Sequence, residues 1–485
     1  MTEEPAGQVH EGFLETPAKP DSVRPVAPFR PPLITRVGIR NYKSIASCSV
    51  PLGPIQFLVG PNGAGKSNFL NALAFVSDAL NGSVEQALRE RGGIDKVRRR
   101  SHGHPTHFTV KLDLQLDSGL RGAYLFEIGA GKRGRFSIRQ ESGQVGSAYF
   151  RYERGRLVHS TEGLAPQAHA ADHLVLPLLG GQETFRPLAE ALRRMAFYNL
   201  NPARMRDLQD PDPGLRLLRD GGNLASVIRE MTRGHRGEDF GMAVNGHLRA
   251  IAPGMESVSW DELGPKETLE FRQRVAGDQH PWRFPASSIS DGTLRALGLL
   301  VACSQGAPDF PRRASLVGIE EPESALHPGA AEAVTDFLLM ASRQVQILAT
   351  THSPKILDHK GLTDEQILVV ESREGESLVG PMDPVSRAAL RDRLYSAGEL
   401  LSRSQMQPDP AALDQKVHLV LPIPSGKRDP SRRRLPPRPA LGPDSAVKVC
   451  QSSRPPDDQG LRNRDGHVEA SRVLREGRNG CAGPE

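Results

Sequence analysis

From residue 33 onward apolar residues recur at regular positions, and two short apolar runs in this part of the chain predict strands. The first run covers residues 33–39 and the second covers Ile55–Val59, which leads directly into a glycine-rich stretch. From Phe69 to Leu80 apolar residues recur three or four positions apart, a spacing typical of a helix, and Asn81-Gly82 supplies a stop. This part of the chain therefore predicts strand, loop and helix in succession.

The pattern changes twice further along the chain. Residues 107–152 alternate apolar and polar positions between glycine-rich turns, which predicts an antiparallel β meander. Residues 184–285 return to mixed helical spacing, for example at Leu188, Leu192 and Met195. Strand-like runs at 316–319, 346–349 and 366–370 alternate with helices, as a largely parallel sheet requires. The predicted class is α/β, with a meander and a helical lobe inserted between two halves of one domain over residues 33–403.

Both ends of the chain differ in composition from this domain. Residues 1–32 are rich in proline and predict a disordered leader, because such a sequence buries too little apolar area to offset its ordering entropy. From about Ser404 to residue 485 the chain has no aromatic residue and carries an Arg432-Arg433-Arg434 run. We expect this low-complexity tail to be disordered or the product of a frameshift.

The charge distribution and the positions of the cysteines limit which binding sites and which cellular location we expect for the chain. The net charge is +5, but residues 406–485 hold 14 Lys/Arg against 10 Asp/Glu, so most of the excess lies in the tail. Any DNA-binding surface of the domain must therefore be a local patch. The four cysteines are far apart, which argues against a zinc site or a disulfide framework. No secretory signal and no long apolar run occurs, so we expect a cytoplasmic protein without a membrane segment.

The glycine-rich stretch carries the clearest chemistry. It follows the pattern Gly-x-x-x-x-Gly-Lys-Ser, whose backbone N–H groups bind phosphate oxygens at the start of a helix. The Lys66 ammonium would neutralise the β and γ phosphates, and the Ser67 hydroxyl would ligate Mg²⁺. The predicted nucleotide-binding residues are Gly60, Pro61, Asn62, Gly63, Ala64, Gly65, Lys66, Ser67 and Asn68.

Three later motifs decide the class of nucleotide-binding protein. Ser290-Asp291-Gly292 precedes an apolar helix and could present hydroxyl and N–H groups to phosphate. Glu320 and Glu321 end an apolar strand, where Glu320 would hold Mg²⁺ and Glu321 would orient or deprotonate the attacking water. His352 follows another strand and would face the γ-phosphate. Each motif alone is commonplace as a helix cap, an acidic turn or a structural histidine, so their order along the chain carries the prediction.

That order resembles the RecF/SMC/OLD-like branch of ABC-type ATPase heads, over roughly residues 33–403. The motifs that carry the resemblance lie at 39–45, 60–68, 289–293, 319–323, 326–328 and 351–354. The resemblance implies a head that dimerises around two ATP molecules. Each ATP would be bound by the phosphate loop of one subunit and by Ser290 and Gly292 of the other. Glu320 stands where ABC heads usually have aspartate, and no γ-phosphate-sensing glutamine can be placed, since Gln140 is expected in a turn.

Three functional readings remain open on the sequence alone. The chain could be an ATPase acting in DNA repair or in defence against foreign DNA, or an ATP-gated clamp that recruits a partner effector such as a nuclease. The engine of a membrane transporter is disfavoured, since 224 residues separate Lys66 from Ser290. Six cations could touch DNA phosphates near the ATP site, although a solvated loop explains them equally well: Arg89, Arg91, Lys96, Arg98, Arg99 and Arg100.

Overall fold

The computed structural model describes residues 33–101, 103–161, 172–233, 236–307, 310, 312–413 and 419–423. The chain divides into two units, Met1–Lys427 and Arg428–Glu485, and every described residue lies in the first. The predicted leader at 1–32, and the predicted tail from residue 424 onward, lie outside the described residues.

A six-stranded sheet forms the centre of this unit, in the order β16-β15-β3-β14-β13-β9. β3, β9, β13, β14 and β15 are parallel, and β16 pairs with β15 in the antiparallel sense. The strands are β3 (Ile55–Val59), β9 (Met195–Tyr198), β13 (Leu316–Glu320), β14 (Gln346–Thr351), β15 (Ile367–Arg373) and β16 (Glu376–Pro381). The predicted α/β class is confirmed, and β3 lies in the interior of the sheet.

A seven-stranded antiparallel sheet has the order β2-β1-β4-β5-β6-β7-β8. Its strands are β1 (Leu33–Tyr42), β2 (Ile45–Pro51), β4 (His107–Gln115), β5 (Arg121–Ala130), β6 (Phe136–Val145), β7 (Ala148–Glu153) and β8 (Arg156–Ser160). The predicted meander is therefore present and continues one strand further. Gln140 lies within β6 and not in a turn, and its side chain contacts Ser142 and Arg151, so it has no place beside the phosphate loop.

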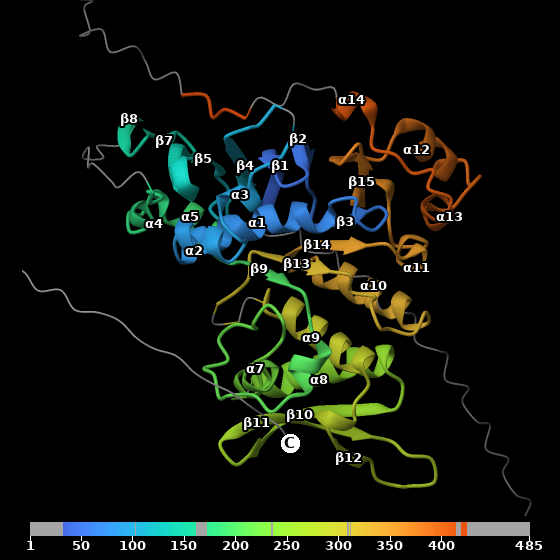
Figure 1. Cartoon of the computed structure of the whole chain (residues 1–485). Coiled ribbons are helices and arrows are strands. Elements are labelled where there is room, and N and C mark those ends of the chain that lie inside the picture. Colours follow the sequence, from blue (N-terminus) through green and yellow to red (C-terminus); the bar gives the residue numbers. More distant parts are fainter. Residues whose placement is uncertain are drawn as a thin grey trace, which may run out of the picture. The chain divides into compact units, whose positions relative to one another are not determined.

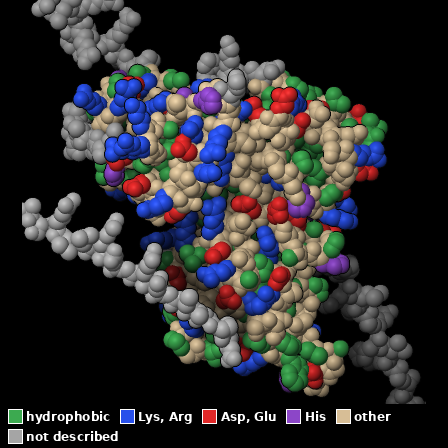
Figure 2. All heavy atoms as spheres, in the orientation of Figure 1, with side chains coloured by type: hydrophobic (Ala, Val, Ile, Leu, Met, Phe, Trp, Pro, Cys, Tyr) green, Lys and Arg blue, Asp and Glu red, His purple; other side chains and the backbone are tan. Residues whose placement is uncertain are grey.

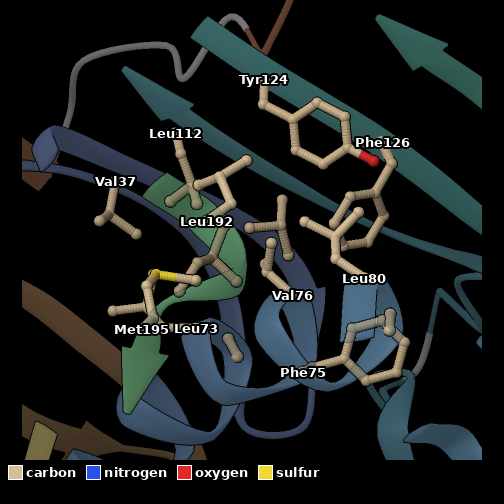
Figure 3. Packing of buried hydrophobic residues seen from close by; sticks show 14 of the residues in the cluster. Val37, Leu73, Phe75, Val76, Leu80, Leu112, Tyr124, Phe126, Leu192 and Met195 are labelled. Carbon is tan, nitrogen blue, oxygen red and sulfur yellow. The ribbon is translucent and has the colours of Figure 1, made fainter. Parts of the chain in front are cut away.

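Helix α1 (Lys66–Asn81) lies between the two sheets (Figure 1). Its apolar face packs on the antiparallel sheet, where Val76 and Leu80 lie close to Leu112 and Phe126 (Figure 3). The opposite face of the six-stranded sheet is covered by a second core, which includes α9 (Asp291–Ser304) and α10 (Ala330–Ala341). The residues of β3 are buried on both faces, which explains its continuous apolar run.

The predicted helical lobe is more mixed than its spacing suggested. It contains α5 (Arg186–Arg193), α6 (Pro202–Arg206), α7 (Leu224–Met231) and α8 (Arg236–Ile251). It also contains a three-stranded antiparallel sheet of β10 (Met255–Leu263), β11 (Lys266–Gln273) and β12 (Trp282–Pro285). Met195 was expected on a helix and instead begins β9, because α5 ends at Arg193 and the chain joins the central sheet.

Short helices complete the unit. The helices are α2 (Val84–Arg89), α3 (Ile94–Val97), α4 (Leu176–Leu179), α11 (Pro354–Leu357), α12 (Pro384–Arg391), α13 (Ala397–Ser402) and α14 (Pro410–Leu413). The end of the domain, expected at residue 403, lies further along the chain. Beyond residue 403, Met406 and Leu421 are buried, and the Tyr149 hydroxyl donates to the Leu421 carbonyl at 3.4 Å. These two apolar side chains bring part of the predicted tail into the folded unit.

Candidate active site

The glycine-rich loop connects β3 to α1, as its sequence predicts. Gly65 has a φ of 106°, a left-handed conformation that favours glycine. A Cβ at this position would lie 2.0 Å from the Ser377 hydroxyl oxygen, so the site also has no room for a side chain. The loop turns sharply and then starts α1 with its N–H groups pointing back toward the concavity.

The Lys66 ammonium lies inside this loop. Its Nζ donates to the carbonyl oxygens of Gly60 at 2.8 Å and Pro61 at 3.0 Å. Burial lowers the pKa of Lys66, while the carboxylates of Glu321 and Glu323 raise it. A buried cation at the start of a helix is a favourable environment for the phosphate groups of a nucleotide.

Two serines brace the loop from outside, and sequence reasoning did not single them out as site residues. Ser377, on β16, donates to the carbonyl of Ala64 at 2.6 Å and lies 2.6 Å from the Ser44 hydroxyl. Asn68 donates to Ser44 at 2.7 Å. Ser44 lies in the turn between β1 and β2, so both sheets hold the loop in place. Ser377 lies more than 300 positions from the loop and has no local signal in the sequence.

The structure brings Ser67 and Glu320 into direct contact. Ser67 Oγ donates to Glu320 Oε2 at 2.7 Å, so the longer glutamate side chain reaches the loop from the end of β13. No group of three His, Cys, Asp or Glu residues that could hold a metal ion occurs among the described positions. A hydroxyl and one carboxylate fit Mg²⁺ bound together with nucleotide phosphates, which usually supply the remaining ligands.

Glu321 and His352 also meet at this edge of the sheet. Glu321 Oε1 lies 3.4 Å from His352 Nδ1, and its Oε2 accepts a hydrogen bond from Ser324 at 3.0 Å. The Glu321 backbone has a φ of 46° and its N–H donates to the Thr350 carbonyl at 3.0 Å. A non-glycine residue in this conformation is costly and is often found at functional sites. The carboxylate is thus directed by neighbours on both sides.

Glu323 is a further carboxylate of the motif at 319–323, and no role was predicted for it from the sequence. Its Oε1 accepts from Thr351 Oγ1 at 2.6 Å and from the His352 backbone N–H at 3.3 Å. Its Oε2 is buried and has no hydrogen-bond partner among the described residues. Glu323 therefore ties the end of β14, which carries His352, to the segment after β13.

Arg295 was also missed. It comes from α9, one helical turn after Gly292, and its Nη2 donates to the Glu320 carbonyl at 3.3 Å. Burial lowers the pKa of Arg295, and the carboxylates of Glu321, Glu323 and Glu320 oppose this shift. Arg295 is the one basic residue of α9 and lies beside the apolar part of that helix, which was a signal that the sequence did contain.

Ser290 and Gly292 lie at a cavity of the chain other than the one beside the glycine-rich loop. Ser290 caps α9 by accepting from the Thr293 N–H at 3.2 Å. Together with Ala325 and His327 they line a cavity of about 480 Å³. By contrast, Gly60, Pro61 and His352 line another cavity, of about 310 Å³. The loop, Glu320, Glu321 and His352 are thus assembled within one chain, whereas Ser290 and Gly292 are presented elsewhere.

The basic stretch at 89–100 is largely engaged within the protein. Arg91 pairs with Asp78 at 2.5 Å and its side chain is 5% exposed. Arg99 pairs with Glu376 at 3.1 Å, and Arg98 forms an ion pair within its own segment. The charges of Arg91 and Arg99 are thus paired within the fold, and contact of this stretch with DNA phosphates stays a prediction.

The sequence from residue 55 to 358 matches the protein family described as "AAA domain, putative AbiEii toxin, Type IV TA system". The OLD nuclease of Thermus scotoductus is 23% identical over 338 residues, covering 67% of this chain and 60% of that protein. Structural maintenance of chromosomes protein 1 of Schizosaccharomyces pombe is 34% identical over 101 residues, covering 19% of this chain and 8% of that protein. The match thus spans less than two thirds of either curated relative.

Solved structures of Smc heads are also similar to this chain. The Smc head domain of Pyrococcus furiosus, bound to the C-terminal domain of ScpA, has 13% identity and a TM-score of 0.45, covering 75% of this chain and 99% of that one. The SMC head domain of Thermotoga maritima has 15% identity and a TM-score of 0.38, covering 72% and 98%. None of the helices described here is long and apolar enough to cross a membrane.

Proposed function

Since the chain belongs to this AAA-domain family and is a RecF/SMC/OLD-like ATPase head, we propose that it binds ATP with Mg²⁺ and hydrolyses it to ADP and phosphate. The single observation that carries this proposal is the contact of Ser67 with Glu320 at 2.7 Å, with Glu321 next along the chain. A phosphate-loop hydroxyl held against the acidic end of a strand provides the protein ligands that Mg²⁺ takes in a nucleotide site of this kind.

Each residue then has a defined task. Lys66 and the N–H groups at the start of α1 bind the β and γ phosphates, and Ser67 and Glu320 hold the metal ion. Bound Mg²⁺ supplies charge neutralisation for the phosphate oxygens. Glu321, directed by His352 and Ser324, accepts a proton from the attacking water, and this role requires it within hydrogen-bond reach of that water.

We further propose that two copies of the chain form the complete site. Ser290 and Gly292 line a cavity distinct from that of Gly60 and Pro61, so the second copy would supply them across a two-fold axis. The cycle of ATP-dependent dimerisation would act in DNA repair or in defence against foreign DNA. The similarity to a nuclease over 338 residues supports a DNA-linked role, in which a partner nuclease or effector would act together with this chain.

Mixing two inactive variants tests the shared site. Lys66→Ala removes the ammonium group that would bind the phosphates. Ser290→Arg places a large side chain at the proposed interface between the two copies. Neither should hydrolyse ATP alone. In an equal mixture half of the dimers are heterodimers with one intact site of two, so activity should return to about a quarter of the wild-type level. Failure to recover any activity, with heterodimers present, would contradict a shared site. ATP hydrolysis that does not respond to DNA would remove support for the DNA-linked role.

A further inference from the structure

Two hairpin turns of the antiparallel sheet carry the same Arg-Gly-Arg tripeptide. The turn between β5 and β6 contains Arg133-Gly134-Arg135. In the hairpin of β7 and β8, Arg154-Gly155 form the turn and Arg156 is the first residue of β8. Both lie at the same end of the sheet, because β6 pairs with both β5 and β7 and the Arg154 N–H donates to the carbonyl of Arg139 on β6 at 3.1 Å. Across the sheet the two turns are two strand spacings apart, about 10 Å, and along the strands the second turn lies at the level of Arg139, about four residues from Arg135.

The arginine at the tip of each turn has an unfavourable backbone conformation. Arg133 has a φ of 56° and Arg154 a φ of 49°, each followed by a glycine of positive φ. Such two-residue turns favour Asn-Gly or Asp-Gly, since an ordinary side chain in the left-handed region costs roughly 1–2 kcal/mol. Arginine at both tips therefore gives up local stability while placing a cation there twice.

These turns also lack internal counter-charges. Five exposed cations form what we call the basic edge, and none of them makes an ion pair with a described residue: Lys132, Arg133, Arg135, Arg154 and Arg156. Two acidic side chains of these strands pair with other arginines: Glu127 with Arg139 at 3.6 Å, and Glu153, which lies opposite Arg156 in the register of β7 and β8, with Arg151 at 2.7 Å. Figure 2 shows Lys and Arg side chains gathered over the part of the molecule that carries β7 and β8 in Figure 1.

We propose that the basic edge binds the phosphate backbone of duplex DNA without reading its sequence. Four of its five cations are arginines, whose planar guanidinium groups bind phosphate oxygens in a bidentate manner. Apolar or aromatic side chains beside the cations would strengthen binding to a membrane surface, and the two Arg-Gly-Arg sequences contain none. The choice of DNA among polyanions rests on the proposed function. The basic edge consists of other residues than the basic stretch at 89–100.

The test is salt-dependent binding of the full chain to a fluorescent duplex, measured without nucleotide. The variant Arg133→Asn/Arg154→Asn removes two charges and creates the favoured Asn-Gly turns, so its unfolding temperature should equal or exceed that of the wild type. Arg391→Gln/Arg393→Asn is the matched control, because it also removes two exposed arginines and Arg393 has a φ of 55°. Anionic phospholipid vesicles serve as a second ligand.

We expect the turn variant to bind the duplex about tenfold or more weakly, and the slope of log K against log salt to fall by about 2, one for each lost phosphate contact. The control should match the wild type. Equal affinity and slope in the turn variant would overturn the inference, as would equal weakening in the control, vesicle binding in place of DNA binding, or no DNA binding by the wild type. Because ATP is absent throughout, none of these outcomes depends on whether the chain hydrolyses it.

Discussion

Thr351 donates its hydroxyl hydrogen to Glu323 at 2.6 Å, across the gap between the ends of β13 and β14. This hydrogen bond holds His352 near Glu321, so we expect Glu323 to act as a positioning residue. Glu323→Ala should lower kcat for ATP hydrolysis about tenfold or more, which corresponds to about 1.4 kcal/mol, with little effect on ATP affinity. Glu323→Gln keeps an acceptor oxygen for Thr351 and should recover most of the activity. An alanine variant with wild-type kcat would contradict this role.

Glu321→Gln separates turnover from binding. The amide cannot accept the proton of the attacking water, so hydrolysis should fall at least about 100-fold. ATP-dependent dimers should persist, because the loop and Ser67 are unchanged. Steady-state phosphate release and sedimentation with ATP measure the two properties, and Glu332→Gln on the exposed face of α10 is the control. If the variant keeps its cellular function as a locked dimer, the chain is an ATP-gated clamp and hydrolysis merely resets it.

Gly292→Ala tests the cavity that contains Ser290. A Cβ at Gly292 would lie 2.5 Å from the carbonyl oxygen of Ala325, so backbone must move. We expect a loss of about 1–3 kcal/mol of stability, as for other overpacked positions, together with a larger loss of ATP hydrolysis than of ATP binding. Gly246→Ala in α8 is the comparison, since a Cβ there meets nothing within 4 Å and should stabilise the helix by up to about 1 kcal/mol. Equal unfolding temperatures for the two variants would argue against this packing.

Glu141 predicts a pH dependence of stability. Burial raises its pKa to about 7, while hydrogen bonds from the Val175 and Leu176 N–H groups and the Tyr124 hydroxyl lower it. The folded state thus binds a proton more readily than the unfolded state, whose ordinary value is 4.5. This contribution is complete below pH 4.5 and is lost as the pH rises through 7.

Thermal unfolding between pH 5 and 8 checks this sign. The wild type should lose stability over this interval relative to Glu141→Gln, by no more than about 3 kcal/mol, because glutamine is neutral at every pH. Glu153→Gln is the control, since the side chain of Glu153 is 44% exposed. Parallel pH profiles for the wild type and Glu141→Gln would show that this carboxyl does not titrate in the interval.

Contiguous features of the fold were predictable because their signals are local. The run from Ile55 into Gly60 and Lys66 places strand, turn and helix within a few residues, and each acidic or histidine motif directly follows its own strand. The sheet order was not predictable, since β9 is a four-residue strand whose pairing with β13 depends on residues more than 100 positions away.

Contacts between distant residues explain what sequence reasoning missed in the site. Ser377 and Ser44 brace the loop only once β16 and the β1–β2 turn meet, and serines in turns or strands are ordinary. The extent of the domain was misjudged for a similar reason. Met406 is a single apolar residue in a polar, proline-rich context. Leu421 belongs to the apolar run at 419–423, which is too short to indicate a segment of the core by itself.

The position of β3 has a consequence for biosynthesis. Its hydrogen-bonding partners on either side are β14 and β15, which the ribosome makes long after the loop that follows β3. Both edges of β3 therefore stay unpaired in the nascent chain until residues 346–369 have emerged, and closing so long a loop is slow. A product that stops before β14 would contain the whole Gly60–Lys66 sequence and still lack the sheet that shapes it, with open edges that favour aggregation.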